Sequence, residues 1–351
     1  MQTKPILKTI FAKAQQRFIF ILSLAAVFGL AACSSGSNSS NEQQAETPVT
    51  SQKDLSTIKV GYCTPSLNAP FYVALSKAIQ KNAESYGMKF ISVDGQGDIS
   101  KQITAVEDLT AKGIDILILN PLDPKALIPT VNAAAKSGLP VFIVDSYIEP
   151  EARYITSVLA DNEGNGELIG EWAAEKLGKT KIKAAIISGA QGNPVGKEKR
   201  LGFIRGLAEA QLRTLGYSDF SIVSQGWGGW SNNGGLKAME DIITAHPEIN
   251  LLVAENDAMA MGAMKAINEA GKANQILVAG FDGQKEALEL IKQDKYGATA
   301  LNSPAGLGKL VVESVVKYLN GDKYLDKVIY TPSVLITKKE VNKFYDPKAI
   351  F

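Results

Sequence analysis

The stretch GLPVFIVDSY, residues 138–147, contains the pattern that indicates the fold class most clearly. Its apolar run PVFIV has the length and composition of a buried strand, and the run ends abruptly in Asp145, Ser146 and Tyr147. A buried strand has no structural need for a carboxylate at its tip. If other strands end in the same way, the pattern indicates parallel α/β sheets with a ligand site beyond the carboxyl ends of their strands.

Short apolar runs alternate with amphipathic segments along most of the chain. Helical spacing is clear in segments such as Ile99, Ile103, Val106 and Leu109. Strands that alternate with helices, with little sign of hairpins, predict two α/β halves built on parallel sheets. The runs are TIKVGYC (57–63), KFISVDG (89–95), DILILNP (115–121), PVFIVDS (140–146), IKAAIISG (182–189), FSIVSQGW (220–227), NLLVAEND (250–257), ILVAGFDG (276–283) and GATALNS (297–303).

Polar residues follow these strands repeatedly. Any one of them could instead cap the helix that comes next, so both interpretations stay open for each residue. Five strands that share the pattern favour a polar ring around a crevice. The residues are Asn120, Asp145, Asn256 with Asp257, Asp282 and Asn302. Separately, three polar residues that precede a proline predict helix starts: Asp123, Asn193 and Ser303.

The composition excludes several classes of protein. The 37 basic and 36 acidic residues nearly cancel, so no overall field attracts nucleic acid. The one histidine, His246, and two cysteines supply no metal-ligand spacing, and no phosphate loop or nucleophile elbow occurs. GNGELIG (164–170) only loosely resembles a dinucleotide fingerprint, and its glycines suit close packing equally. We therefore expect no cofactor, no metal and no enzymatic activity.

The N-terminus is an expected export signal. A basic segment precedes the apolar run 18–32, and LAAC (30–33) resembles the lipobox of bacterial lipoproteins, whose cysteine is acylated, with palmitate among its chains. We expect a signal peptide over 1–32, a lipidated Cys33 and a flexible tether over 33–56. The protein would be exported and anchored to the cell envelope membrane, facing the periplasm or the cell exterior.

The second cysteine, Cys63, would then have no disulfide partner. Whether it is a buried small side chain or a reactive thiol stays open at this point.

Six segments resemble one known family. They are LNAPFYVAL (67–75), DLTAKGIDILILNPLD (108–123), LPVFIVDS (139–146), ADNEGNGELIGEW (160–172), TAHPEINLLVAENDAMAMGAM (244–264) and VAGFDG (278–283). The family is that of the type I periplasmic binding proteins, closest to the ribose-type, LacI-like sugar-binding proteins of ABC importers. It implies two similar doubly wound parallel-sheet lobes, joined by a three-strand hinge, that close over a small polar ligand. Repressors of this fold carry an N-terminal DNA-binding motif, where this chain has its export signal.

The resemblance also implies the lobe boundaries. The chain would cross between the lobes near Ala160, Ser303 and Pro332. The N-terminal lobe would comprise 57–160 plus 303–331, and the C-terminal lobe 161–302 plus 332–351.

Ligand roles follow from the resemblance position by position. Phe71 and Tyr72 match an aromatic pair of the first lobe, and Trp230 matches the opposing aromatic, so a ligand would lie between flat apolar faces. Stacking suits the C–H face of a sugar and equally a cation. The polar positions of the expected site are Asn120, Asp145, Ser146, Lys197, Asn256, Asp282 and Asn302.

Departures from the family leave the ligand open. Ser146 stands where sugar-binding relatives usually have an arginine, and Lys197 replaces a second arginine before the Gly-Phe motif. Ala69 replaces an asparagine, and Asn302 a glutamine. Neither serine nor lysine reproduces the planar donor fork of a guanidinium. We expect a monosaccharide or polyol, with a small amine or other solute as the alternative.

The partners follow from the family as well. We expect a monomer that delivers its ligand to the transmembrane subunits of an ABC permease. A sensory receptor that reports ligand to a signalling partner is the alternative, because the same cleft would serve both roles.

Overall fold

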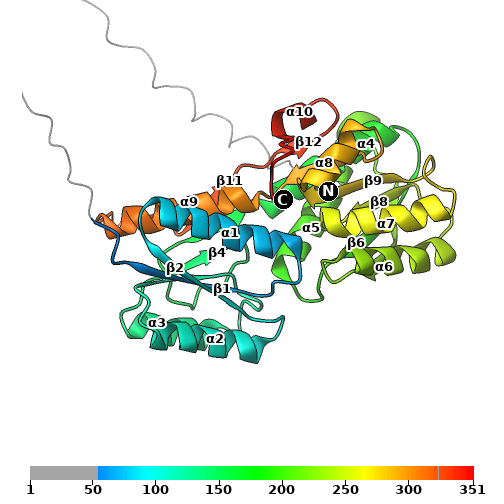
Figure 1. Cartoon of the computed structure of the whole chain (residues 1–351). Helices are drawn as coiled ribbons and strands as arrows, with labels where there is room; N and C mark the ends of the chain where they lie inside the picture. The colour runs from blue at the N-terminus through cyan, green and yellow to red at the C-terminus, as the bar shows by residue number, and fades with distance from the viewer. Residues whose placement is uncertain (1–53, 323) are drawn as a thin grey trace, which may run out of the picture. The chain divides into compact units, whose positions relative to one another are not determined.

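The computed structural model describes residues 54–322 and 324–351 (Figure 1). The expected signal peptide, the lipidated Cys33 and most of the expected tether lie outside these residues. Leu55, which the sequence analysis assigned to the tether, is buried in the core of the first lobe. The folded part therefore begins slightly before residue 57. None of the helices in the described residues is both long and apolar enough for a membrane span.

The first lobe is built on a six-stranded parallel sheet with the strand order β11-β5-β4-β3-β1-β2. Its strands are β1 (Lys59–Thr64), β2 (Lys89–Asp94), β3 (Ile116–Leu119), β4 (Val141–Val144), β5 (Ser157–Ala160) and β11 (Val328–Thr331). Helices α1 (Pro70–Ser85) and α9 (Pro304–Leu319) pack on one face of the sheet, and α2 (Ile99–Ala111) and α3 (Ile128–Lys136) on the other. Strands β3 and β4 are buried throughout, because helices cover both of their faces.

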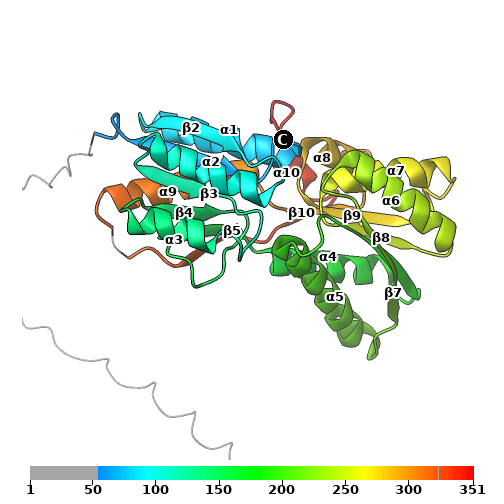
Figure 2. The ribbon, with the colours of Figure 1, turned by 90° about the horizontal axis from the view of Figure 1, so that it is seen from below.

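The second lobe has a sheet of the order β12-β10-β9-β8-β6-β7, parallel except for the short β12. Its strands are β6 (Ile182–Ser188), β7 (Phe220–Trp227), β8 (Leu251–Ala254), β9 (Leu277–Asp282), β10 (Ala298–Leu301) and β12 (Leu335–Ile336). Helices α4 (Asn162–Leu177) and α5 (Pro194–Leu215) cover one face of this sheet, as Figure 2 shows. Helices α6 (Asn232–Ala245), α7 (Asp257–Glu269) and α8 (Lys285–Lys292) cover the other.

The chain passes between the two sheets three times. It leaves the first lobe after β5, returns between β10 and α9, and crosses again between β11 and β12. The prediction of two doubly wound α/β lobes joined by a three-strand hinge is confirmed.

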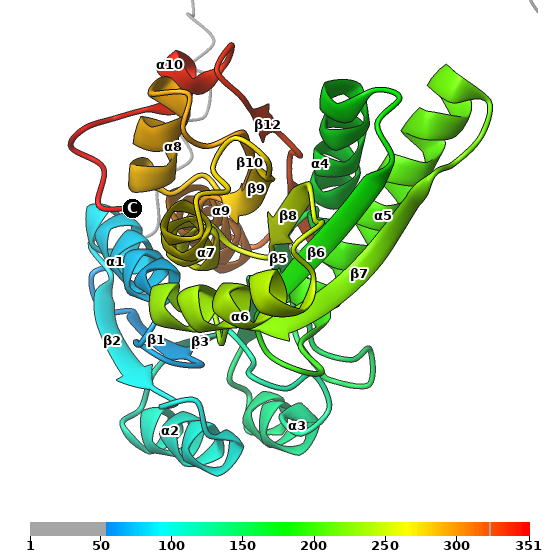
Figure 3. The ribbon, with the colours of Figure 1, turned by 90° about the vertical axis from the view of Figure 1, so that its right-hand side faces the viewer.

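The sequence predicted that residues 332–351 belong to the second lobe. The end of this segment instead contacts the first lobe. The short helix α10 (Val341–Phe344) packs on α8, but Phe351 lies against the core of the first lobe. Figure 3 shows this last segment running from α10 past α8 to α1. The segment ends on the first lobe because the apolar ring of Phe351 is partly buried there against Phe71 of α1.

Helices α4 and α5 approach each other backbone to backbone. A Cβ atom at Gly166 of α4 would collide with the main chain at Lys199 and Phe203, and one at Gly202 of α5 with the carbonyl of Glu163. Close packing, rather than nucleotide binding, therefore accounts for Gly166 of the GNGELIG segment. The contact also fixes α5 against α4 and with it the position of Lys199 on α5.

Candidate functional site

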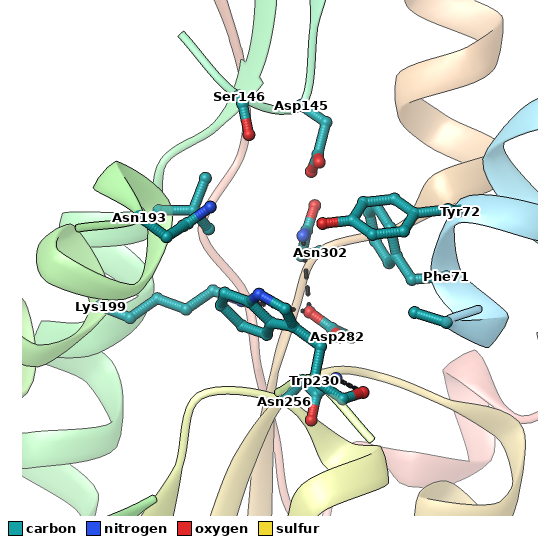
Figure 4. Close-up of a pocket in the computed structure, with 12 residues that line it drawn as sticks. Phe71, Tyr72, Asp145, Ser146, Asn193, Lys199, Trp230, Asn256, Asp282 and Asn302 are labelled. Carbon is teal, nitrogen blue, oxygen red and sulfur yellow. Dashed lines mark hydrogen bonds and ion pairs between the residues drawn. The ribbon is translucent and has the colours of Figure 1, made fainter. Parts of the chain in front are cut away.

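Residues that follow strands of both sheets line one cavity between the lobes (Figure 4). It holds about 360 Å³ of unfilled space, part of which is open solvent. Its polar side chains are nearly inaccessible: Asp145 is 7% exposed, Asp282 5% and Lys199 2%. The structure thus has the lobes closed over the cavity. The lining consists of Ala69, Phe71, Tyr72, Asp145, Ser146, Asn193, Val195, Lys199, Trp230, Asn256, Asp282 and Asn302.

The aromatic walls of the cavity come from opposite lobes. Phe71 and Tyr72 lie in the first turn of α1, with their rings edge to face and their centroids 5.9 Å apart. Trp230 lies between β7 and α6 in the second lobe and faces them in Figure 4. Its indole covers Gly189, where any side chain would collide with the ring. A flat ligand between these walls would lose most of its contact with water.

Asp145 directly follows β4 and points into the cavity (Figure 4). Its Oδ2 accepts a hydrogen bond from Nδ2 of Asn120 at 2.8 Å. Burial raises the pKa of this carboxyl to about 6. The hydrogen bond from Asn120 and the positive charge of Lys199 act in the opposite direction and lower the pKa. Among the described residues Asp145 forms no ion pair, so this carboxylate can still accept hydrogen bonds from a ligand.

A second carboxylate, Asp282 at the end of β9, has a cation beside it. Nζ of Lys199 lies 3.2 Å from Oδ1 of Asp282 and also donates to the carbonyl of Glu255 at 2.9 Å. Asn302 donates to the same carboxylate at 3.4 Å. Burial raises the pKa of Asp282, and the nearby lysine opposes this. Oδ1 of Asn302 is buried without a partner in residues 54–322 and 324–351, which leaves an acceptor at the cavity.

Backbone strain concentrates at this cavity. Five described residues other than glycine have a positive φ, and three of them are cavity residues: Asp145 (67°), Trp230 (60°) and Asp282 (111°). Such conformations are unfavourable for these residue types and occur often at ligand sites, where the surrounding structure holds them in place. The strain supports a functional cavity independently of any family resemblance.

Asp257 supports the turn that carries Asp282. Its buried Oδ2 accepts hydrogen bonds from the backbone N–H groups of Gly283 and Gln284, both at 2.9 Å, and Oδ1 accepts from the hydroxyl of Tyr296 at 2.7 Å. Burial and the charge of Asp282 raise the pKa of Asp257 to about 7. This residue immediately follows Asn256, whose side chain caps α7 and donates to the carbonyl of Trp230.

Most of the predicted site residues meet at the cavity, but two do not. Asn120 is buried behind Asp145 and orients its carboxylate without lining the cavity. Lys197 is exposed on α5, and Lys199 occupies the cavity instead. Residues two positions apart on a helix point in nearly opposite directions, so only one of these lysines can face inward. The predicted residues that line the cavity are Phe71, Tyr72, Asp145, Ser146, Trp230, Asn256, Asp282 and Asn302.

Three further residues that line the cavity, Asn193, Val195 and Lys199, had no predicted ligand role. The helical spacing of Val195, Lys199 and Phe203 was a usable signal, because it puts the lysine on the apolar face of α5. Asn193 was identified only as a helix cap, and its Oδ1 does accept from the backbone N–H of Gly196.

Two lobes that close over an aromatic-walled polar cavity define a solute-binding protein. The sequence profile described as "Periplasmic binding protein domain" matches residues 60–323. The ribose import binding protein RbsB of Bacillus subtilis is 39% identical over 280 residues, which cover 80% of this chain and 87% of that protein. The chain therefore belongs to the type I periplasmic binding proteins, in the ribose-type branch, and is an exported binding protein rather than an enzyme.

Solved structures agree with this assignment. An ABC transporter solute-binding protein from Mycobacterium smegmatis, with bound glycerol, is similar at a TM-score of 0.77 and 32% identity, over 84% of this chain and 98% of that one. A periplasmic solute-binding protein from Actinobacillus succinogenes, with bound D-allose, is similar at a TM-score of 0.75 and 27% identity, over 82% of this chain and all of that one.

Proposed function

We propose that this chain is the solute receptor of an ABC importer, closes its lobes over a neutral monosaccharide or polyol, and delivers it to the permease. The observation that carries the proposal is the arrangement of the cavity. Aromatic rings of the two lobes oppose each other, and two carboxylates with several amide groups surround the space between them. Rings fit the C–H faces of a polyhydroxy compound, and carboxylates accept its hydroxyl donors.

The size and chemistry of the cavity limit the ligand. Twelve residues of the two lobes line the cavity and its charged side chains are buried, which suits a single small sugar or polyol rather than an oligosaccharide. Asp145 and Asp282 would each accept hydroxyl donors, and hydrogen bonds to a charged group contribute about 1.5–3 kcal/mol each. The similar proteins from Bacillus, Actinobacillus and Mycobacterium, named for ribose import or solved with D-allose or glycerol, support the same class of ligand.

A small amine is the second candidate, because one observation favours it. Asp145 is a buried carboxylate beside aromatic rings, with no ion pair among the described side chains. An ammonium group could pair with it and lie against the rings. Lys199 opposes this candidate, since it already places a positive charge in the same cavity.

A thermal-shift screen tests the proposal. The purified protein is heated with D-ribose, D-allose, glycerol, myo-inositol and a set of small amines. A ligand present at 100 times its dissociation constant stabilises the native state by about 2.7 kcal/mol, which such a screen detects easily. A shift with a sugar or polyol supports the proposal. A shift with amines alone would replace it by the second candidate.

The anchor and the partners belong to the same proposal. Lipidation at Cys33 would hold the receptor at the membrane, and the polar tether up to about residue 54 would let the lobes reach the permease. The receptor would act as a monomer. Fractionation of cells that express a Cys33→Ser variant tests the anchor, because the variant should leave the membrane fraction while its ligand binding stays unchanged.

A further inference from the structure

The segment after α10 connects the two lobes by contacts that the hinge does not make. We call residues 346–351 the C-terminal strap. On the second lobe, Nζ of Lys285 in α8 donates to the carbonyl of Ala349 at 2.9 Å. On the first lobe, the ring of Phe351 meets the ring of Phe71 edge to face, with the centroids 5.7 Å apart. Figure 3 shows the path of the strap from α10 past α8 to α1.

We infer that Phe351 is a positioning residue of the ligand site, and that the C-terminal strap holds Phe71 in place across the lobes. The inference rests on the proposed function, because it takes Phe71 as a ligand contact. Phe351 does not line the cavity, so it acts on a ligand only through Phe71.

The aromatic contacts form a continuous row toward the cavity. Phe351 lies edge to face on Phe71, and Phe71 lies edge to face on Tyr72. Phe71 and Tyr72 are in the first turn of α1, which has a proline at its start but no side-chain cap. The N–H groups of Tyr72 and Val73 share a single backbone acceptor, the carbonyl of Ala69, at 3.1 and 3.4 Å. Packing of Phe351 on Phe71 therefore supports the part of α1 on which the cavity wall depends.

The strap lies beside open space between the lobes. A second cavity, with about 1470 Å³ of unfilled space that includes open solvent, is lined by residues of α1, of α8 and of the strap, Phe351 and Ala349 among them. Asp282 lines this cavity as well as the first. Because α1 and α8 leave this space between them, the strap is placed to transmit a movement of the second lobe to Phe71.

The strap also lies beyond the part of the chain that defines the family. The matching family profile ends at residue 323, before α10 and the strap begin. Motif positions in the sequence identify Phe71 but not the residue that supports it. Phe351 would thus affect ligand affinity in this chain although it is not one of the residues that line the cavity.

The experiment uses the exported protein with Phe351→Ala, and Ile350→Ala as the matched control, because Ile350 is 69% exposed. Hydrogen exchange of the ligand-free protein is measured first. We expect faster exchange at the amides of the first turn of α1 in Phe351→Ala, no change in the control, and recovery in Phe351→Tyr. Lys285→Met should produce the same local change with Phe351 intact, because it releases the strap from α8.

Binding is then titrated with whichever of D-ribose, D-allose and glycerol binds the unmodified protein. Phe351→Ala should weaken binding about three- to tenfold, as expected for the loss of one aromatic pair, with a nearly unchanged melting temperature. If exchange and affinity both equal those of the control, the inference is wrong. If Phe71→Leu leaves binding unchanged, the proposed site fails instead. If no probe binds but exchange responds, the strap is supported and the proposed ligand class is not.

Discussion

Replacing Asp145 by Asn separates the ligand role of this residue from its effect on stability. The change keeps the size of the side chain, and asparagine tolerates the left-handed backbone at this position, where φ is 67°. The amide can still accept the hydrogen bond from Asn120. Its NH₂ group would then face the hydroxyl donors of a bound sugar, so an acceptor becomes a donor.

The expected magnitudes follow from the structure. Loss of charge-assisted hydrogen bonds costs about 1.5–3 kcal/mol each, which corresponds to a loss of affinity of roughly two decades or more. The stability of the ligand-free protein should increase in this variant, whereas its affinity for the ligand decreases. Burial raises the pKa of Asp145 from 3.8 to about 6, so the ionised carboxylate destabilises the native state above pH 6 by up to about 3 kcal/mol. This penalty disappears as the pH falls below about 4.

Calorimetry and thermal unfolding at pH 7.5 therefore check two effects of opposite sign. Asp145→Asn should bind roughly a hundredfold more weakly, and its ligand-free form should melt at a temperature several degrees higher. An unchanged affinity would remove Asp145 from the site. A lower melting temperature would show that the carboxylate stabilises the fold instead.

Other predictions test the aromatic wall of the second lobe, the buried lysine of the cavity, the pH dependence of binding and the lipid anchor. Trp230→Ala should cost about 2–4 kcal/mol of binding with little change in the unfolding midpoint of the ligand-free protein; a large decrease would make the ring part of the core. Lys199→Met should weaken binding strongly in a titration, whereas Lys197→Met, on the exposed side of α5, should not. Affinity should fall as the pH drops below about 6, because Asp145 must lose its proton to accept ligand donors; a flat profile from pH 5 to 8 contradicts this. Cys33→Ser should move the protein from membranes to the soluble fraction.

Much of the fold could be predicted from local patterns. Continuous apolar runs such as PVFIV (140–144) and ILVAGF (276–281) indicate parallel strands, and the aspartate after each run lies where the lobes meet. The predicted caps Asn193 and Ser303 start α5 and α9. Asp123 caps a turn instead, because α3 begins only at Ile128. Cys63 is fully buried and its pKa is raised to about 12, which favours the interpretation as a small core side chain.

What could not be predicted depends on contacts between distant segments. The choice between Lys197 and Lys199 is decided by the rotation of α5, which the glycine contact with α4 sets. Asn120 follows β3 as Asp145 follows β4, but Asn120 lies behind Asp145. Which of the two side chains faces the cavity depends on how the neighbouring strands β3 and β4 pair. The strap is harder still, since Phe351 and Phe71 are 280 positions apart.

The most direct test of the central claim is a crystal structure of the complex with the sugar or polyol that the screen identifies. We expect the ligand between the rings of Phe71 and Tyr72 on one side and Trp230 on the other, with its hydroxyl groups on Asp145 and Asp282. A ligand bound elsewhere, or one in this cavity without a contact to either carboxylate, would contradict the account.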